Sequence, residues 1–332
     1  MVIHPWAWGI LALVAIGLIV IDFLGHARNP HPPTAVEAAR WTLFYIGLAG
    51  LFGVGIWLTN GGLYAQEFYA GWAMEWSLSV DNLFVFILIL KAFRVPRENQ
   101  QKALLLGIVI ALLLRLVFIL LGAALVSRFS WVFFIFGLWL LWTAFSQVRE
   151  TARGSDEDEE YHESGFIRAV RRVLLITDGF IGNRMLFRHG GRTYITPMLV
   201  VVLALGSADL MFAFDSIPAI FGITQQAFLV FACNVFALMG LRQLFFLVDA
   251  LLSKLVYLGY GLGVILSFIG VKLILEALHA NTLPFINGGS GVEWAPEISV
   301  SVSLGVIVVT LAVTVVASLI RSAMDEGDAH GN

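Results

Sequence analysis

The sequence has little charge and almost no cysteine. Asp, Glu, Lys and Arg make up only 13% of the 332 residues, about half the share found in soluble domains, whereas 59% are hydrophobic. This composition excludes a soluble globular domain and predicts an all-α integral membrane protein, because helices satisfy their own backbone hydrogen bonds in lipid. The single cysteine, Cys233, allows no disulfide within the chain, and we expect it to be a small core residue.

Motifs of several protein classes are also missing. The sequence has no phosphate-binding loop and no recognisable nucleophile–base pair, so we expect neither an ATP-driven pump nor an enzyme. Nothing in it points to nucleic-acid binding or to a tightly bound cofactor. No histidine lies in the middle of a hydrophobic segment, and imidazole and thiolate are the ligands that Zn and Cu prefer.

Long hydrophobic segments dominate what is present. Nine are long enough to cross a membrane as helices: 6–24, 41–59, 72–93, 103–126, 129–148, 195–221, 226–248, 255–279 and 297–320. With the N-terminus outside, sixteen Lys and Arg residues fall on the cytoplasmic side, and only Arg128 falls on the outer side. The sequence therefore predicts nine transmembrane helices with the N-terminus outside and the C-terminus in the cytoplasm.

The longest predicted cytoplasmic loop covers residues 149–194. It contains an acidic run at 156–160, which we expect to be a solvated linker, followed by a basic amphipathic segment at 166–176. That segment is predicted to be a helix that lies either on the inner membrane surface or against the protein. A protein partner could dock on this loop.

Segments 72–93 and 195–221 share a pattern of polar residues. Each holds two carboxylates six residues apart, and a small polar residue directly follows the second carboxylate. The pattern consists of Glu75, Asp81 and Asn82 in the first segment and of Asp209, Asp215 and Ser216 in the second. Charged groups inside a membrane are costly, so this pattern predicts a functional site.

The correspondence continues through the following segments, where Arg115 matches Arg242 and Gly137 matches Gly270. Because the two carboxylate segments run in opposite directions, we predict two inverted three-helix repeats, a design with which secondary transporters build a site in mid-membrane. The predicted parts are 1–71 (two bracing helices), 72–148 (first repeat), 149–194 (cytoplasmic loop), 195–279 (second repeat) and 280–332 (outer loop, last helix and cytoplasmic tail).

The polar residues predict a site rich in oxygen where the repeats meet. Glu75, Ser79 and Asn82 share one face of a helix. Pro218 lacks the N–H that would bind a carbonyl oxygen one turn earlier, so that oxygen is free near Asp215. Oxygen ligands suit Mg, Ca and Mn, and neighbouring acids can exchange a metal ion for protons.

Other interpretations of these charges stay open. The acids could form structural ion pairs with Arg115 and Arg242, or the arginines could line a proton or anion pathway. Asn234 could be a ligand or a hydrogen-bonding residue of the core. Lys272 and Glu276, four residues apart, are expected to form a structural pair.

Four stretches of the sequence resemble the TerC family, bacterial integral membrane proteins named for tellurite resistance. They are EFYAGWAMEWSLSVDNLFVF, ADLMFAFDSIPAI, CNVFALMGLRQLFFL and FIGVKLIL, and the resemblance extends over about residues 10–280. It is strongest to the Alx-type branch, which is associated with manganese export and grouped with LysE-type exporters. The resemblance implies that the acidic residues of the two motif helices handle the metal.

The resemblance thus predicts secondary-active export of divalent cations, above all Mn²⁺, from a site in the bacterial inner membrane. Protons or the membrane potential would drive it, and Arg115 and Arg242 would limit the negative charge of the empty site. The alternatives are Ca²⁺ or another cation as substrate, or a membrane scaffold that assists the assembly of exported proteins. Two departures stand out: Gly206 where an acid is expected in relatives, and Cys233 where serine is usual.

Overall fold

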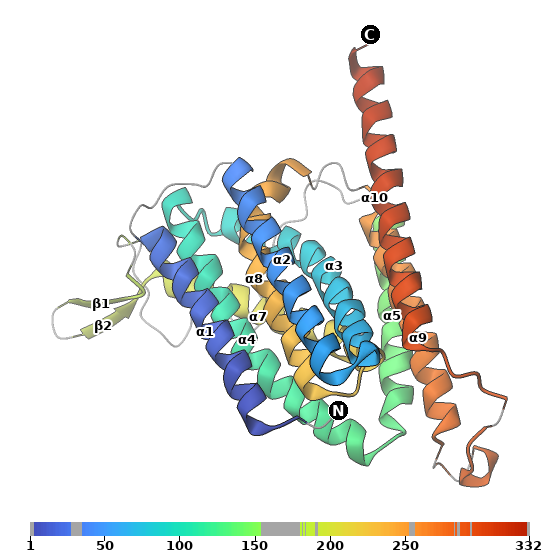
Figure 1. Cartoon of the computed structure of the whole chain (residues 1–332). Helices are drawn as coiled ribbons and strands as arrows, with labels where there is room; N and C mark the ends of the chain where they lie inside the picture. The colour runs from blue at the N-terminus through green and yellow to red at the C-terminus, as the bar shows by residue number, and fades with distance from the viewer. Residues whose placement is uncertain are drawn as a thin grey trace.

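The structure is a computed structural model in which long α-helices form a bundle (Figure 1). It describes residues 3–27, 35–153, 180, 182, 184–189, 192–251, 256–281, 283, 286–292 and 294–330. The helices are α1 (Pro5–Ala27), α2 (Ala35–Asn60), α3 (Gly62–Ala92), α4 (Arg97–Arg128), α5 (Val132–Arg153), α7 (Pro197–Phe221), α8 (Ala227–Leu251), α9 (Leu258–His279) and α10 (Val300–His330). A short 3₁₀ turn, η2 (Asn287–Gly289), lies between α9 and α10.

Each predicted hydrophobic segment coincides with one of these helices. Within the described residues, six helices are apolar over a length sufficient to cross a membrane, namely α2, α4, α5, α7, α9 and α10. The protein is therefore a multi-pass membrane protein. The two ends of the chain lie at opposite ends of the bundle (Figure 1). The count of nine spans and the assignment of one end to the cell exterior stay predictions.

The centre of the bundle consists of α7 and α8. Between Phe228 and Leu241 every residue of α8 is buried, as expected for a helix that is apolar on all sides and surrounded by others. The peripheral helices α2 and α10 instead expose large apolar side chains, among them Leu51, Leu58 and Val309. In a membrane such side chains contact lipid, so this bundle is apolar both inside and outside.

The helix pairs follow the correspondence seen in the sequence. α3 packs along α8, α4 along α7, and α5 along α9. Exchanging the two predicted repeats maps this set of pairs onto itself. Gly137 of α5 and Gly270 of α9 face each other: a Cβ on Gly137 would lie 2.8 Å from the carbonyl oxygen of Gly270, and a Cβ on Gly270 would lie 2.9 Å from that of Gly137. The two backbones therefore touch at the pair of glycines that the repeat aligns.

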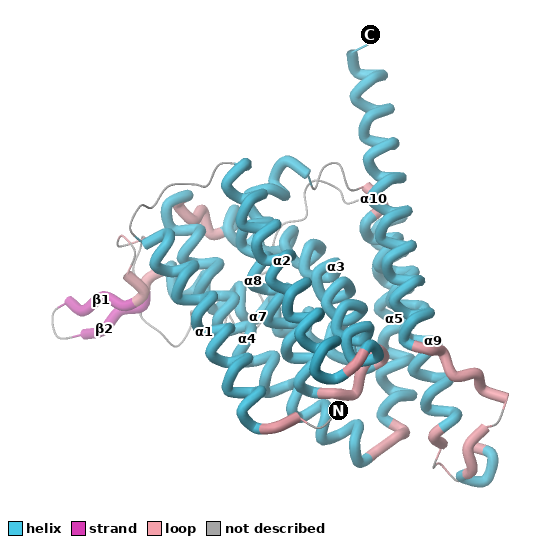
Figure 2. The backbone as a smooth tube through the Cα atoms, in the orientation of Figure 1, coloured by secondary structure: helices cyan, strands magenta, loops and turns pink. Residues whose placement is uncertain are grey.

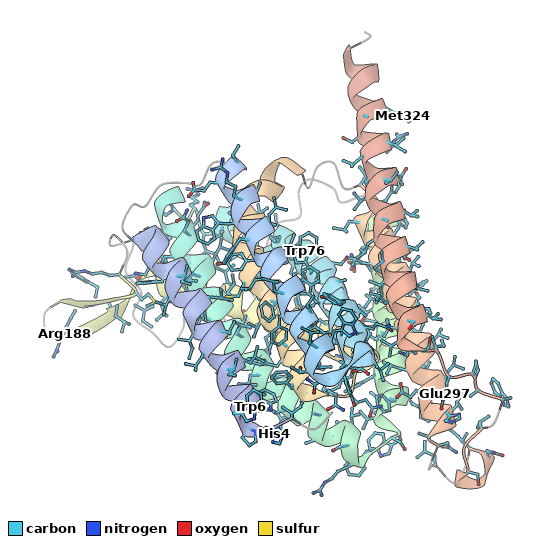
Figure 3. All side chains as sticks on the ribbon, in the orientation of Figure 1. His4, Trp6, Trp76, Arg188, Glu297 and Met324 are labelled. Carbon is cyan, nitrogen blue, oxygen red and sulfur yellow. The ribbon has the colours of Figure 1, made fainter. Side chains whose placement is uncertain are left out.

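The prediction of an all-α protein was wrong in one place. Residues Leu186–His189 and Arg192–Ile195 form an antiparallel hairpin, β1 and β2, in which His189 pairs with Arg192 (Figure 2). Arg188 projects from this hairpin away from the bundle (Figure 3). The sequence signal was there, because two glycines between short strands are typical of a two-residue hairpin. The acidic run at 156–160 and the segment 166–176 lie outside the described residues.

Candidate functional site

Arg115 is the hub of a polar cluster inside the bundle. It lies on α4, its side chain is completely buried, and it binds groups from three other helices. Its Nε donates to Asp209 Oδ2 at 2.8 Å, and Nη2 donates to Asp209 Oδ1 at 3.0 Å, so the guanidinium grips this carboxylate with two parallel bonds. The same group forms an ion pair with Glu75 through Nη1.

Two uncharged side chains complete the contacts of Arg115. Nη1 lies 3.3 Å from Ser216 Oγ on α7 and 2.5 Å from Asn234 Oδ1 on α8. The amide nitrogen of Asn234 donates to the carbonyl oxygen of Val230 at 2.9 Å, which fixes the orientation of the amide. Asn234 is therefore a hydrogen-bonding residue of the core that turns its oxygen toward the site.

α3 presents a buried polar face beside this hub. Glu75, Ser79 and Asn82 are all buried, as expected from their shared helix face. Within the described residues, Glu75 Oε2, Ser79 Oγ and Asn82 Nδ2 have no hydrogen-bond partner. Buried polar atoms without a partner cost about 1–3 kcal/mol each, so this face is suited to receive a polar or charged guest.

The described charges of the cluster do not balance. Two carboxylates, Glu75 and Asp209, surround one guanidinium. A buried net charge is unfavourable in a medium of low dielectric constant, so a further positive charge or a proton would stabilise the cluster. The helix positions of Asp81 and Arg242 lie in α3 and α8, but their side chains are outside the described part, so their predicted roles stay predictions.

Asp215 binds a different set of partners. Its Oδ1 accepts hydrogen bonds from Trp139 Nε1 at 2.7 Å and from Thr143 Oγ1 at 3.1 Å, both on α5. Pro218 is buried in the last turn of α7, one turn after Phe214. The free carbonyl oxygen beside Asp215 stays a prediction. Trp139 and Thr143 did not emerge from the sequence, because a tryptophan in a hydrophobic segment is usually an ordinary membrane aromatic.

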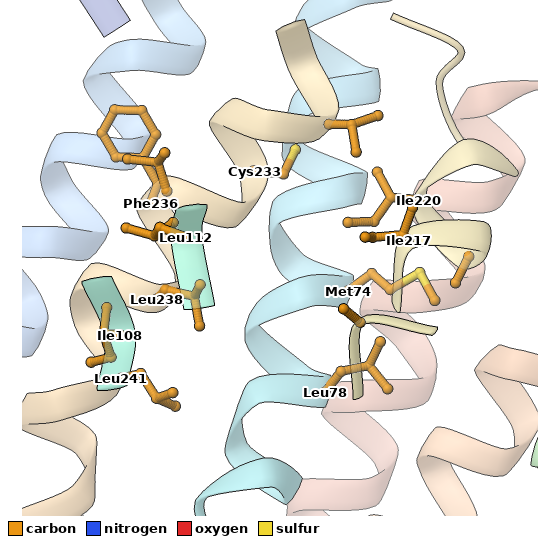
Figure 4. Close-up of a cluster of buried hydrophobic side chains, with 14 of the residues drawn as sticks. Met74, Leu78, Ile108, Leu112, Ile217, Ile220, Cys233, Phe236, Leu238 and Leu241 are labelled. Carbon is orange, nitrogen blue, oxygen red and sulfur yellow. The ribbon is translucent and has the colours of Figure 1, made fainter. Parts of the chain in front are cut away.

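The helices that carry the Arg115 cluster also contribute apolar side chains to one buried core. Met74 and Leu78 of α3, Leu112 of α4 and Ile217 of α7 are buried close to the polar residues in the sequence and line the same core (Figure 4). Cys233, next to Asn234, donates from its thiol to the carbonyl oxygen of Phe68 at 3.3 Å, so it packs as the small core residue that we expected. Such a surrounding strengthens electrostatic interactions inside it.

Gly206 lies on α7 one turn before Asp209. A Cβ at this position would lie 2.9 Å from Ile110 Cγ2 of α4. The side of α7 that would carry an acid is therefore filled by the neighbouring helix.

Among the described residues, no group of three or more His, Cys, Asp and Glu side chains could hold a metal ion, so a cation at the Arg115 cluster would also need hydroxyl and amide oxygens.

The sequence is similar to those of several known membrane proteins. A membrane protein of Mycobacterium tuberculosis H37Rv, itself uncharacterized, is 46% identical over 311 residues, which are 94% of this chain and 78% of that protein. The chloroplast thylakoid membrane protein TERC of Arabidopsis thaliana is 36% identical over 280 residues, or 84% of this chain and 68% of the other. A protein of Escherichia coli K12 that is provisionally described as the membrane-bound redox modulator Alx is 33% identical over 319 residues, or 93% of each chain. No solved structure matches.

The family pattern described as "integral membrane protein TerC family" matches residues 60–326. That range includes all six residues predicted to form the metal site and the hub, Arg115. With relatives that cover most of its length, the chain belongs to the integral membrane protein TerC family.

Proposed function

We propose that this protein exports divalent metal cations by secondary-active transport, with Mn²⁺ as its principal substrate, across the bacterial inner membrane. The observation that carries the proposal is the convergence of Glu75 and Asp209 on Arg115 in the core. These two acids occupy corresponding positions of the two predicted repeats. A site made of one acid from each repeat is what a transporter needs if it alternates between two faces.

The chemistry of the cluster supports a hard cation. Its donors are carboxylate, hydroxyl and amide oxygens from three helices: Glu75, Ser79, Asn82, Asp209, Ser216 and Asn234. Such oxygens bind Mn²⁺ and Ca²⁺, whereas imidazole and thiolate, which favour Zn and Cu, do not contact Arg115 in the described part of the chain.

Arg115 acts in this proposal as a built-in cation. While no metal is bound, its guanidinium neutralises part of the charge on Glu75 and Asp209. A divalent ion that enters from the cytoplasm competes with the guanidinium for the same carboxylates, and protons from the outside compete with the metal. Each competitor weakens the binding of the others, which couples metal exit to proton entry.

A structural ion-pair network is the second candidate, and the completeness of the Arg115 contacts favours it. Every nitrogen of the guanidinium has a partner, as in a network that serves only to hold helices together. In that case the protein could still act as a scaffold for the assembly of exported proteins. The two candidates differ in whether the acids are needed for ion movement.

Flux in proteoliposomes separates them. Purified protein would be reconstituted in a defined orientation, and Mn²⁺ and Ca²⁺ uptake would be followed with and without a pH gradient. We expect saturable Mn²⁺ flux that falls at least tenfold in Asp209→Asn and is unchanged in Glu150→Gln, an exposed carboxylate at the end of α5. Flux of neither ion by folded protein would contradict export, and preference for Ca²⁺ would change the substrate.

A further inference from the structure

A second polar site lies at one end of the bundle. A cavity of about 530 Å³ opens where α3 begins and where α7 and α9 end. Its walls include the turn between α7 and α8 and residues 296–298, just before α10. Glu297 marks this end in Figure 3, and Met324 lies toward the opposite end. In the predicted topology this is the outer side of the membrane.

Two carboxylates that line this cavity are held by the α7–α8 turn. Thr224 Oγ1 donates to Glu67 Oε2 of α3 at 2.6 Å, and Gln225 Nε2 donates to Glu276 Oε1 of α9 at 2.7 Å. The backbone N–H of Gln226 donates to Thr224 Oγ1 at 3.2 Å and so orients the hydroxyl. Within the described residues, the second oxygen of each carboxylate accepts no hydrogen bond. The turn therefore fixes two acids while leaving one oxygen of each available.

A buried lysine shares the cavity with these acids. Lys272 is only 7% exposed, and its ammonium donates to Ser303 Oγ of α10 at 3.2 Å. Among the described residues, no ion pair within 4 Å joins Lys272 to Glu276 or to Glu67. The ammonium still attracts both carboxylates electrostatically, so the predicted pair with Glu276 is an attraction over a longer distance and not a direct contact. A buried ammonium bound to a neutral hydroxyl, close to carboxylates that bind neutral donors, is an unusual arrangement for a purely structural pair.

The lining of the cavity is negative overall. Its described residues include the carboxylates of Glu67, Glu276 and Glu297 and, as the only Lys or Arg among them, Lys272. The formal charge of these described residues is −2 with His279 neutral. At the rim, His279 Nε2 lies 2.9 Å from Glu297 Oε1. A water molecule takes up about 30 Å³ in the liquid, so the cavity can hold an ion together with much of its hydration shell.

We propose that this cavity binds a partly hydrated divalent cation, with Glu67 and Glu276 as its carboxylate ligands and with Lys272 as a tethered competitor. The ammonium of Lys272 lowers the affinity of the cavity for the cation by charge repulsion. When no cation is present, the ammonium neutralises part of the charge of the two carboxylates. A wide, hydrated site with a competing positive charge binds a cation weakly. Weak binding suits a site from which the cation leaves the protein. The role as the exit of the export route rests on the proposed function, whereas the binding itself does not.

The test measures Mn²⁺ binding to the purified full-length protein by the loss of the electron paramagnetic resonance signal of free Mn²⁺. It is made in the Glu75→Gln/Asp209→Asn background, which removes the described acids of the core cluster. We expect one weakly bound Mn²⁺ whose affinity falls at least tenfold in Glu67→Gln and in Glu276→Gln, and is unchanged in Glu150→Gln. We expect Lys272→Met to raise the affinity about tenfold.

Thermal unfolding of every variant separates binding from folding. Unchanged binding in folded Glu67→Gln and Glu276→Gln would overturn the site, as would an affinity in folded Lys272→Met that is not higher than in its parent. If Lys272→Met fails to fold, Lys272→Gln replaces it with the same expectation. Absence of Mn²⁺ flux in the unmodified protein together with binding in this background would reject export and keep the site; flux without such binding would reject the site and keep export.

Discussion

Glu75 and Asp209 hold the same guanidinium, although they belong to different helices, α3 and α7. Arg115 reaches both from α4, with its Nε at 2.8 Å from Asp209 Oδ2. Two buried carboxylates around one positive charge leave the described groups of the cluster with a net negative charge, and we propose that this charge attracts a second cation.

Replacement of Arg115 by Met should destabilise the protein and make it sensitive to metal. The change leaves two buried carboxylates without their counter-charge, and breaking a buried ion pair in this way costs about 3–5 kcal/mol. Added Mn²⁺ should restore part of the lost thermal stability, because the ion can replace the guanidinium. The measurement is the unfolding temperature in detergent with and without Mn²⁺. An equal response of the variant and the parent to Mn²⁺ would contradict the competition between Arg115 and metal.

The hydrogen bond from Trp139 to Asp215 predicts an effect that is specific to one tryptophan. Trp139→Phe removes the donor at 2.7 Å and should raise the apparent KM for Mn²⁺ severalfold, since Asp215 loses one of the two donors that orient it. Trp142→Phe is the matched control, because Trp142 is exposed and packs on Trp139. Concentration dependence of flux gives KM for both variants. Equal effects of the two changes would mean that the indole hydrogen bond has no role in transport.

Gly206 predicts a steric effect that a neighbouring change can relieve. An aspartate at this position would place its Cβ against Ile110, and overpacking of a core costs about 1–3 kcal/mol. Gly206→Asp should therefore lower the unfolding temperature, and Ile110→Ala should recover part of the loss in the double variant. A double-mutant cycle on thermal stability measures the coupling. Additive effects would show that the two side chains do not meet.

The glycine contact between α5 and α9 should be intolerant of a single methyl group. In Gly137→Ala and Gly270→Ala the new Cβ meets a backbone carbonyl oxygen, which cannot rotate away. Each change should separate the helices, reduce stability and reduce flux at least severalfold. Gly305→Ala on α10 serves as control, because nothing lies within 4 Å of its Cβ. Normal stability and flux in both variants would show that this backbone contact is not needed.

Much of this architecture could be predicted, because a membrane requires long apolar helices and tolerates few charged residues inside them. Each hydrophobic segment coincides with a helix. A charged residue inside such a segment is conspicuous, as Glu75, Asp209 and Arg115 are. Cys233 also packs in the core as expected. What the sequence could not give was the pairing of these charges, since it depends on the distance between helices.

Features that depend on tertiary contacts escaped sequence analysis. The bond between Trp139 and Asp215 joins two helices, and an indole has no sequence signal that separates a donor from a lipid-facing ring. Lys272 and Glu276 have the spacing of a helix pair, yet α10 supplies Ser303 as a nearer partner for the lysine. Glu67 does not stand out in the sequence, because it lies before the predicted segment 72–93, in the first turns of a helix that begins at Gly62.

Metal binding between Glu75 and Asp209 is tested by the position of Mn²⁺ in an experimental structure of the protein prepared with this ion. Anomalous scattering at the manganese edge locates the metal without ambiguity about its identity. We expect a peak between the carboxylates of Glu75 and Asp209, with the guanidinium of Arg115 withdrawn from at least one of them. A manganese-saturated, transport-active protein in which Arg115 still binds both carboxylates, with no metal between them, would contradict it.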